Sequence, residues 1–337
     1  MTAVLFTCAG QRVDIVSEFG HAGAFTIAAD VNPLAPALYH ADRQHLVPRV
    51  DDPGYIAALA EIVRLHDVKL IVPLTDLDHL QLLAGRAELG GLVLLPEPDA
   101  IAAVGDKYLA HRLFLERGIP SPPTWLPDDV PGDARNPLLV KARQGFGSRH
   151  IYGAASRAEL DFFLGYTTVE SMVQQVCLGD EFSIDVFCDL DSRCLNAIPR
   201  TMIESKGGES IKGVTIKDAE LIEHGRFVAE TLRLVGPATI QCFREEGELR
   251  VTDINPRFGG AFPLPTAAGS RYPELAIALA NGERPAPRLG DFVEGIGMTR
   301  FFSHLILARD ADGTLTPYAE ASPPGAVPAR PVDVQAS

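Results

Sequence analysis

The stretch "ATIQCFREEGELRVTDINPRFGG", residues 238–260, holds two apolar segments joined by a short acidic turn that contains Gly247. Two such segments around a short turn are typical of a β-hairpin. If the turn is centred on Gly247, Gln241 lies opposite Asp253, and Asn255 lies on the same face one pleat further along. The hairpin therefore brings together three side chains that carry oxygen.

Carboxylate and amide oxygens are ligands for a hard cation, and Mg²⁺ commonly takes one or two protein carboxylates together with water and substrate phosphates. The set is too sparse for calcium and has the wrong chemistry for zinc. Arg257 continues the alternation and supplies a fixed positive charge for a transferring phosphoryl group. The alternative is a solvated strand face followed by an ordinary turn, and the hairpin by itself does not separate the two.

The whole chain has 337 residues and 46% hydrophobic content, enough to bury a large core and to form two or three domains. Its apolar runs fall far short of the roughly 20 residues that a membrane helix needs. The N-terminal stretch "MTAVLFTCAGQR" has no basic leader and reads as a first strand, so we expect a cytoplasmic protein.

A net charge of −14 disfavours binding to nucleic acid or to anionic lipid, because such surfaces are held by clustered Lys and Arg. A small anionic ligand needs only a few local cations. Five scattered cysteines without a CxxC pair argue against a disulfide framework and against a structural zinc site.

The pattern of apolar segments changes along the chain. Over residues 1–98, short apolar runs alternate with helical patterns, which predicts a parallel α/β domain covered on both sides. Residues 99–172 begin with a helix capped by Asp99 and continue, after a proline-rich connector, into the strands of a small lobe. Residues 173–310 add strands joined by short turns, so both parts are expected to be α+β with antiparallel sheets. Residues 311–337 have no period and are expected to form a mobile tail.

A second candidate site is "LVKARQGFGSRHIY", residues 139–152. Lys141 ends an apolar strand, and Gly145 and Gly147 let the backbone approach a phosphate closely. The segment lacks the GxxxxGK[ST] pattern of a P-loop. A glycine-rich hairpin turn is the alternative.

A third candidate is "VQQVCLGDEFSIDVF", residues 173–187. Backbone groups from Gln175 to Cys177 could contact an adenine edge, and Glu181 could accept hydrogen bonds from ribose hydroxyls. The alternative is an ordinary hairpin.

Taken together, these segments resemble the ATP-grasp superfamily, in particular the branch similar to the large subunit of carbamoyl phosphate synthetase. The segments that carry the resemblance are "GDKYLAHRLFLERGIPSP", "VKARQGFGSR", "GDEFSIDV", and "QCF" followed by "DINPRFGG". The resemblance covers about residues 1–305. It implies a pre-ATP-grasp α/β domain followed by a two-lobed ATP-grasp fold that holds ATP between antiparallel sheets.

The resemblance also implies roles for individual residues. Contacts to ATP are expected from Lys107, Lys141, the glycine loop Gly145, Phe146, Gly147 and Ser148, the hinge residues Gln174, Gln175 and Val176, and the ribose-binding Glu181. The expected magnesium ligands are Gln241, Asp253 and Asn255, with Arg257 beside the γ-phosphate and the acyl phosphate. The groups expected to act in catalysis are Arg257, Lys141 and Asn255.

Two features differ from the family pattern. Gln174 and Gln175 stand where an acid is frequent near the adenine, and "KAR" replaces the commoner Lys-Pro. The first domain carries "CAGQR" where a dinucleotide-binding fold has G-x-G-x-x-G, which argues against a dehydrogenase.

The acceptor side of the site is expected near "ESKGGESIKG", residues 204–213, because this loop borders the acceptor site in related proteins. We hypothesise that Arg200 holds the substrate carboxylate and that Glu209 orients the amine or the loop. The alternative is a solvated loop whose charges have no specific role.

The resemblance implies an ATP-dependent ligase that joins a carboxylate to an amine, or to a similar nucleophile, on small molecules. The reaction passes through an acyl phosphate and releases ADP and phosphate. Its cofactors are ATP and Mg²⁺, and related proteins are often homodimers. The alternatives are chemistry of the carbamoyl phosphate synthetase type, which needs two modules and an ammonia supply, and a nucleotide-binding regulatory protein without turnover.

Overall fold

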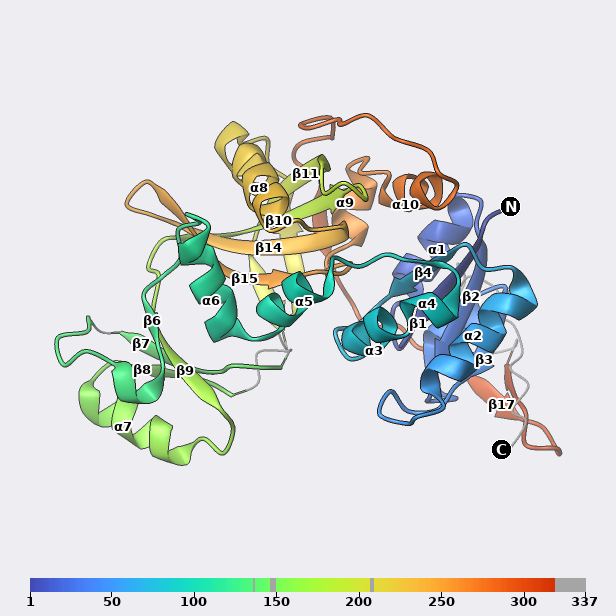
Figure 1. Cartoon of the computed structure of the whole chain (residues 1–337), viewed down its shortest axis with the longest axis horizontal. Coiled ribbons are helices and arrows are strands. Elements are labelled where there is room, and N and C mark those ends of the chain that lie inside the picture. Colours follow the sequence, from blue (N-terminus) through green and yellow to red (C-terminus); the bar gives the residue numbers. More distant parts are fainter. Residues whose placement is uncertain (136, 146–149, 207–208, 319–337) are drawn as a thin grey trace. The chain divides into compact units, whose positions relative to one another are not determined.

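The computed structural model describes residues 1–135, 137–145, 150–206 and 209–318. The chain divides into two compact units, and each is described by itself (Figure 1). The first consists of Met1–Leu95, Arg271–Ala286 and Phe301–Ser337, and the second of Pro96–Ser270 and Pro287–Arg300.

The first unit contains a five-stranded parallel sheet in the order β3-β2-β1-β4-β5 (Figure 1). Its strands are β1 (Ala3–Thr7), β2 (Phe25–Asp30), β3 (Arg43–Leu46), β4 (Leu70–Pro73) and β5 (Leu92–Val93). The helical elements are α1 (Val13–His21), η1 (Pro36–His40), α2 (Tyr55–His66), α3 (His79–Ala84), α4 (Arg86–Leu89) and, from a distant part of the chain, α10 (Tyr272–Ala280). Strand β1 is buried along its whole length, as expected for the centre of a sheet with both faces covered. The predicted parallel α/β domain is confirmed.

The segment expected to be a mobile tail, residues 311–337, begins with the turn and second strand of a hairpin. Strand β17 (Leu307–Arg309) pairs antiparallel with β18 (Leu315–Pro317). Residues 319–337 lie outside the described residues.

Two helices, not one, open the second unit. They are α5 (Pro98–Gly105) and α6 (Lys107–Glu116), and Asp106 caps the second by accepting hydrogen bonds from the backbone N–H groups of Tyr108 and Leu109. The prediction of a single helix capped by Asp99 is therefore wrong. Asp99 lies inside the first turn of α5, which starts at Pro98 with Glu97 at the N-cap position, so Asp99 comes too late in the chain to be the cap.

A small antiparallel sheet follows, in the order β6-β9-β7-β8. Its strands are β6 (Thr124–Trp125), β7 (Leu138–Ala142), β8 (Ile151–Ala154) and β9 (Ser171–Gln175), with a short turn η2 (Pro127–Asp129) in the proline-rich connector. Helix α7 (Arg157–Tyr166) covers it and is capped by Ser156, whose hydroxyl accepts from the Glu159 N–H.

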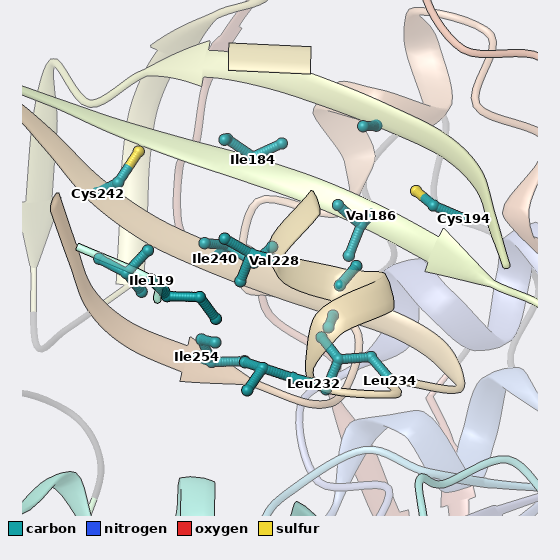
Figure 2. Packing of buried hydrophobic residues seen from close by; sticks show 14 of the residues in the cluster. Ile119, Ile184, Val186, Cys194, Val228, Leu232, Leu234, Ile240, Cys242 and Ile254 are labelled. Atoms are coloured by element: carbon teal, nitrogen blue, oxygen red, sulfur yellow. The ribbon is translucent and has the colours of Figure 1, made fainter. Parts of the chain in front are cut away.

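A second antiparallel sheet has the order β11-β10-β14-β15. Its strands are β10 (Asp180–Cys188), β11 (Cys194–Thr201), β14 (Gly236–Glu245) and β15 (Glu248–Asn255). One face is aliphatic and packs against α8 (Ala219–Thr231), as Figure 2 shows for Ile184, Val186, Ile240 and Val228. The predicted antiparallel lobes are confirmed.

Shorter elements complete the second unit. They are β12 (Glu204–Lys206), β13 (Glu209–Val214), α9 (Pro263–Ala267) and β16 (Gly297–Thr299). Strands β12, β13 and β16 form a separate three-stranded sheet. The loop expected at residues 204–213 is thus partly a hairpin.

Candidate nucleotide and metal site

The turn between β14 and β15 is shorter than the sequence suggested. Glu246 and Gly247 both have positive φ, 52° and 84°, which is the pattern of a two-residue type I′ turn, and Cys242 pairs with Val251. The register then shifts by one residue, so that Gln241 pairs with Asp253. The predicted pairing is confirmed, but a β-bulge produces it and not the position of the turn.

The bulge decides which way Asp253 points. Leu249 and Val251 lie on the buried aliphatic face, and a regular strand would place Asp253 on that face too. The extra residue, Thr252, reverses the alternation, so that Ile254 is buried instead. The carboxylate is thereby delivered to the opposite face.

Polar residues form two adjacent rows across this opposite face. In the first row Arg200 of β11 pairs with Ser183 of β10, Ser183 with Gln241 of β14, and Gln241 with Asp253 of β15. The second row is Ile198, Asp185, Thr239 and Asn255. The sequence interpretation missed Ser183, Asp185 and Thr239, although the alternation Glu181, Ser183, Asp185 in "EFSIDV" carries the same signal as the alternation in β15.

Arg200 is held in this face by a buried ion pair. Its Nε donates to Asp185 Oδ2 at 2.8 Å, and Thr239 Oγ1 donates to Asp185 Oδ1 at 2.7 Å. The Arg200 side chain is 3% exposed, and its Nη1 is buried without an acceptor among the described residues. The Nε edge of the guanidinium is therefore fixed by Asp185, while the Nη1 donor is available to a bound acceptor.

The chain after β15 returns over the polar face. A Cβ atom on Gly259 would lie 2.4 Å from Thr239 Oγ1, so the backbone approaches the strand closely there. Arg257 Nη2 donates to Asn255 Oδ1 at 3.3 Å, and its Nη1 donates to the Phe258 carbonyl at 3.2 Å. The predicted phosphate-binding arginine thus lies against one of the predicted metal ligands.

Lys107 links the hairpin to the start of the glycine loop. Its Nζ lies 3.6 Å from Asp253 Oδ1 and donates to the Gly145 carbonyl at 3.2 Å. Lys107 and Asp253 are 146 positions apart in the sequence, and no local sequence pattern predicts that they lie close together. The structure brings Lys107, Asp253 and Gly145 together.

Lys141 is a buried cation. Its Nζ donates to Gln174 Oε1 at 3.2 Å, and Gln174 Nε2 donates to Thr124 Oγ1 at 3.0 Å. Burial lowers the pKa of Lys141, while the charges of Asp253 and Glu181 act in the opposite direction. Because an ammonium only donates, the amide oxygen of Gln174 must face Lys141. Both ends of this glutamine are therefore already used within the protein.

The hinge residues have their backbone N–H groups partly occupied. Gln175 donates to the Pro123 carbonyl at 2.9 Å, and Val176 donates to the Pro137 carbonyl at 3.1 Å. Burial raises the pKa of Glu181, and the nearby charges of Lys141 and Arg200 lower it. Of the remaining predicted residues, Phe146, Gly147, Ser148 and the side chain of Glu209 lie outside the described residues.

The donor set fits Mg²⁺. Gln241, Asp253 and Asn255 supply one carboxylate and two amide oxygens from neighbouring strands, with no sulfur or imidazole. Among the described residues, no group of three or more His, Cys, Asp and Glu side chains is placed to hold a metal ion. The remaining positions of a magnesium ion would be left to water and phosphates.

Comparisons with known proteins agree with this architecture. Residues 4–89 match the model of the PylC-like N-terminal domain, and residues 167–300 match that of an ATP-grasp in the biosynthetic pathway with Ter operon. The second match makes residues 167–300 similar to ATP-grasp proteins, and both matches agree with the parallel sheet of the first unit and the antiparallel sheets of the second.

The chain is similar to several proteins of known name. It is 23% identical over 234 residues to the carbamoyl phosphate synthase large chain of Agathobacter rectalis, which aligns with 63% of this chain but only 21% of that protein. The chain thus spans about a fifth of this relative. Its fold is similar to N5-carboxyaminoimidazole synthetase from Staphylococcus aureus complexed with ADP, with a TM-score of 0.72, 16% identity, and coverage of 92% and 84% of the two chains.

Two further structures have the same fold. The biotin carboxylase domain of Hydrogenobacter thermophilus 2-oxoglutarate carboxylase, a dimer in complex with MgADP and bicarbonate, gives a TM-score of 0.71 at 17% identity over 87% of this chain and 72% of that chain. An L-amino acid ligase from Bacillus licheniformis gives 0.68 at 14% identity over 85% and 75%.

These solved structures are at most 17% identical to the chain and show its fold, which two of them share in complexes with ADP. Within the described part of the chain, every helix is too short or too polar to cross a bilayer.

Proposed function

We propose that this protein is a carboxylate–amine ligase for small molecules that works through an acyl phosphate. The observation that supports it most is the pairing of Gln241 with Asp253 on a face that also carries Asn255, with Lys107 within 3.6 Å of the Asp253 carboxylate. The reaction needs oxygen ligands for a cation and several cations for phosphates. The polar face carries the oxygen ligands, and the cations are Lys107 of α6, Lys141 of β7 and Arg257 after β15. Magnesium, when bound, would neutralise charge on the phosphate oxygens.

The first step transfers the γ-phosphoryl group. A carboxylate oxygen of the acid attacks the γ-phosphorus of ATP, the bond to the bridging β,γ-oxygen breaks, and ADP leaves with that electron pair. The role of the protein is positioning and charge neutralisation, which we assign to Lys107, Lys141 and Arg257.

In the second step an amine nitrogen attacks the acyl carbon, the bond to the phosphate oxygen breaks, and the nitrogen loses a proton. We assign the carboxylate of the acid to Arg200. Its Nε edge is held by Asp185, and its buried Nη1 has no acceptor among the described residues, so a substrate oxygen would satisfy it. The adenine edge is assigned to the carbonyl of Gln175 and the backbone around Val176, and the ribose to Glu181.

The test is a screen of amino acid pairs, and of other small acids with amines, for release of ADP, read together with the mass of the product. Bicarbonate with ammonia belongs in the screen, because release of ADP with that pair alone would favour chemistry of the carbamoyl phosphate type. Stabilisation by MgATP without ADP release for any pair would favour a nucleotide-binding regulatory protein.

Substitution tests the residue assignments in the same assay. Asp253→Ala and Arg257→Ala are each expected to lower ADP release by about 10²-fold or more, as expected for loss of a preorganised charge, and to leave the melting temperature of the free protein nearly unchanged. Glu248→Ala is the matched control, because Glu248 lies at the exposed start of the same strand and pairs with Arg250. Full activity of the Asp253 and Arg257 variants would refute the assignment.

A further inference from the structure

Arg143 lies between Lys141 and Gly145 in the sequence, one residue after the end of β7 and two residues before Gly145. Both of its backbone polar groups are used. Its N–H donates to the Glu170 carbonyl at 2.9 Å, and its carbonyl accepts from the N–H of Lys107 at 2.8 Å. The backbone of Arg143 is therefore bonded directly to the first residue of α6.

The guanidinium of Arg143 makes a second connection to the same place. Its Nη2 donates to Asp106 Oδ2 at 2.6 Å and its Nε to Asp106 Oδ1 at 3.3 Å, a two-pronged ion pair. Asp106 is 4% exposed and is the residue that caps α6. The guanidinium also lies 5.8 Å from the ring centroid of Tyr108. We call this set, Asp106, Tyr108 and Arg143, the α6–β7 clasp.

The clasp lies next to both phosphate-binding lysines in the sequence. Lys107 follows Asp106 directly, and Lys141 precedes Arg143 by two residues. Lys107 Nζ in turn donates to the carbonyl of Gly145, whose φ of 118° is open only to glycine. One ion pair thus fixes the positions from which two lysines and the first glycine of the loop extend.

We propose that Arg143 is a positioning residue for the nucleotide phosphates. It sets the spacing between Lys107 and Lys141 and anchors the base of the glycine loop without contacting the nucleotide itself. The inference rests on the proposed function in so far as the ligand of these lysines is a nucleoside di- or triphosphate. An arginine suits the role because its planar fork engages both carboxylate oxygens at once, which the single ammonium of a lysine does not.

The chain contains a matched control for this arrangement. Arg244 also pairs with an aspartate that caps a helix, Asp218 of α8, at 2.7 Å, and its guanidinium also lies over an aromatic ring, that of Phe182, at 5.3 Å. Both ion pairs belong to the second unit. A purely structural role of Arg143 would give the same phenotype in Arg143→Ala and Arg244→Ala.

The experiment measures the dissociation constant of MgADP by calorimetry, and the melting temperature of the free protein, for the wild type, Arg143→Ala, Arg143→Lys, Asp106→Asn and Arg244→Ala. Arg143→Ala is expected to weaken MgADP binding by about tenfold or more, because misplaced charges lose most of their effect. Arg143→Lys is expected to recover only part of the loss. Arg244→Ala is expected to lower the melting temperature and to leave the dissociation constant within twofold.

A double-mutant cycle with Lys107→Met identifies the route of the effect. If Arg143 acts by placing Lys107, the losses in MgADP affinity from the two single changes are expected to be less than additive in the double variant. Arg143→Ala and Arg143→Lys with wild-type affinity, or an equal loss of affinity in Arg244→Ala, would overturn the proposal while leaving the proposed function standing. Failure of the wild type itself to bind MgADP would overturn both.

Discussion

The two faces of the sheet β11-β10-β14-β15 are made by the same strands and have opposite chemistry. One face presents Ile184, Val186 and Ile240 to helix α8 (Figure 2), and the other presents the rows that contain Arg200, Gln241 and Asp253. The aliphatic face needs only burial, which is non-directional and tolerates changes of shape. The polar face depends on which residue stands opposite which. On β15 one bulge, at Thr252, keeps the apolar side chains on the aliphatic face and Asp253 on the polar face.

Insertion of one alanine between Gln241 and Cys242 is expected to have the largest effect, because it gives Thr252 a partner on β14 and so removes the bulge. Asp253 would then lie on the same face as Val251, and burial of an unpaired carboxylate costs at least several kcal/mol, a large share of a domain's typical stability. Urea unfolding followed by circular dichroism is expected to show loss of the cooperative transition of the second unit. Deletion of Thr252 is the control, because Asp253 then follows Val251 directly and stays on the polar face opposite Gln241. An insertion variant with wild-type stability would show that the strand can keep its faces apart without the bulge.

Asp185→Ala is expected to have the next largest effect. It leaves Arg200 buried without its counter-ion, and breaking a buried ion pair from one side costs about 3–5 kcal/mol in the free energy of unfolding. Asp185→Asn keeps one acceptor oxygen for Arg200, and its amide N–H group can donate to the Thr239 hydroxyl, so it is expected to cost less. The measurement is urea unfolding of both variants beside the wild type. Equal stability of the Ala variant and the wild type would mean that the polar face tolerates an uncompensated charge.

The smallest expected effect is a pH dependence of nucleotide binding that arises at Lys141. Burial lowers the pKa of its ammonium, so it loses its proton at a lower pH than an exposed lysine does. Phosphate binding needs the charged form, and MgADP affinity is therefore expected to be greatest at low pH and to fall as the pH rises through the lowered pKa. Above that pKa the charged fraction of Lys141 falls by about tenfold per pH unit, which sets the largest decrease in affinity that this group can cause. Calorimetry between neutral and alkaline pH measures it.

Lys141→Arg is the control for this pH dependence, since a guanidinium stays charged over the whole range. The variant is expected to bind with a flatter profile. Identical profiles for the two proteins would assign the titration to another group.

The sequence predicts the parts of this fold in which side-chain alternation is regular. The parallel sheet of the first unit and the antiparallel sheets of the second follow from apolar periods and turn residues. The pairing of Gln241 with Asp253 was predicted from a turn centred on Gly247, but it depends on the bulge at Thr252. Strand β3, with the sequence "RQHL", has no apolar alternation and pairs with one neighbour only, so it gives no such signal. Helix α10 (Tyr272–Ala280) packs in the first unit, although Pro96–Ser270 of the second unit separates it in the sequence from Met1–Leu95. No local pattern predicts that placement.

Parts of the candidate site were also beyond prediction, for a different reason. The contacts of Lys107 with Asp253 and of Arg143 with Asp106 join residues that are far apart in the sequence, and only the packing of α6 against the strands creates them. The cap at Asp106 was hidden because "AVGDKY" continues the helical apolar spacing on both sides of it. Ser183 and Asp185 lie in a strand that reads as buried, and their role becomes visible only once β11 and β14 are placed beside it.

The lack of a side chain at Gly259 has a consequence for how this protein tolerates change. The backbone at Gly259 lies on Thr239 with less clearance than one methyl group needs. An alanine there would have to lift Arg257 together with the backbone that carries it. A substitution that looks like a harmless loop variant would thus alter the height of a charge above the sheet, and with it the room left for a phosphate.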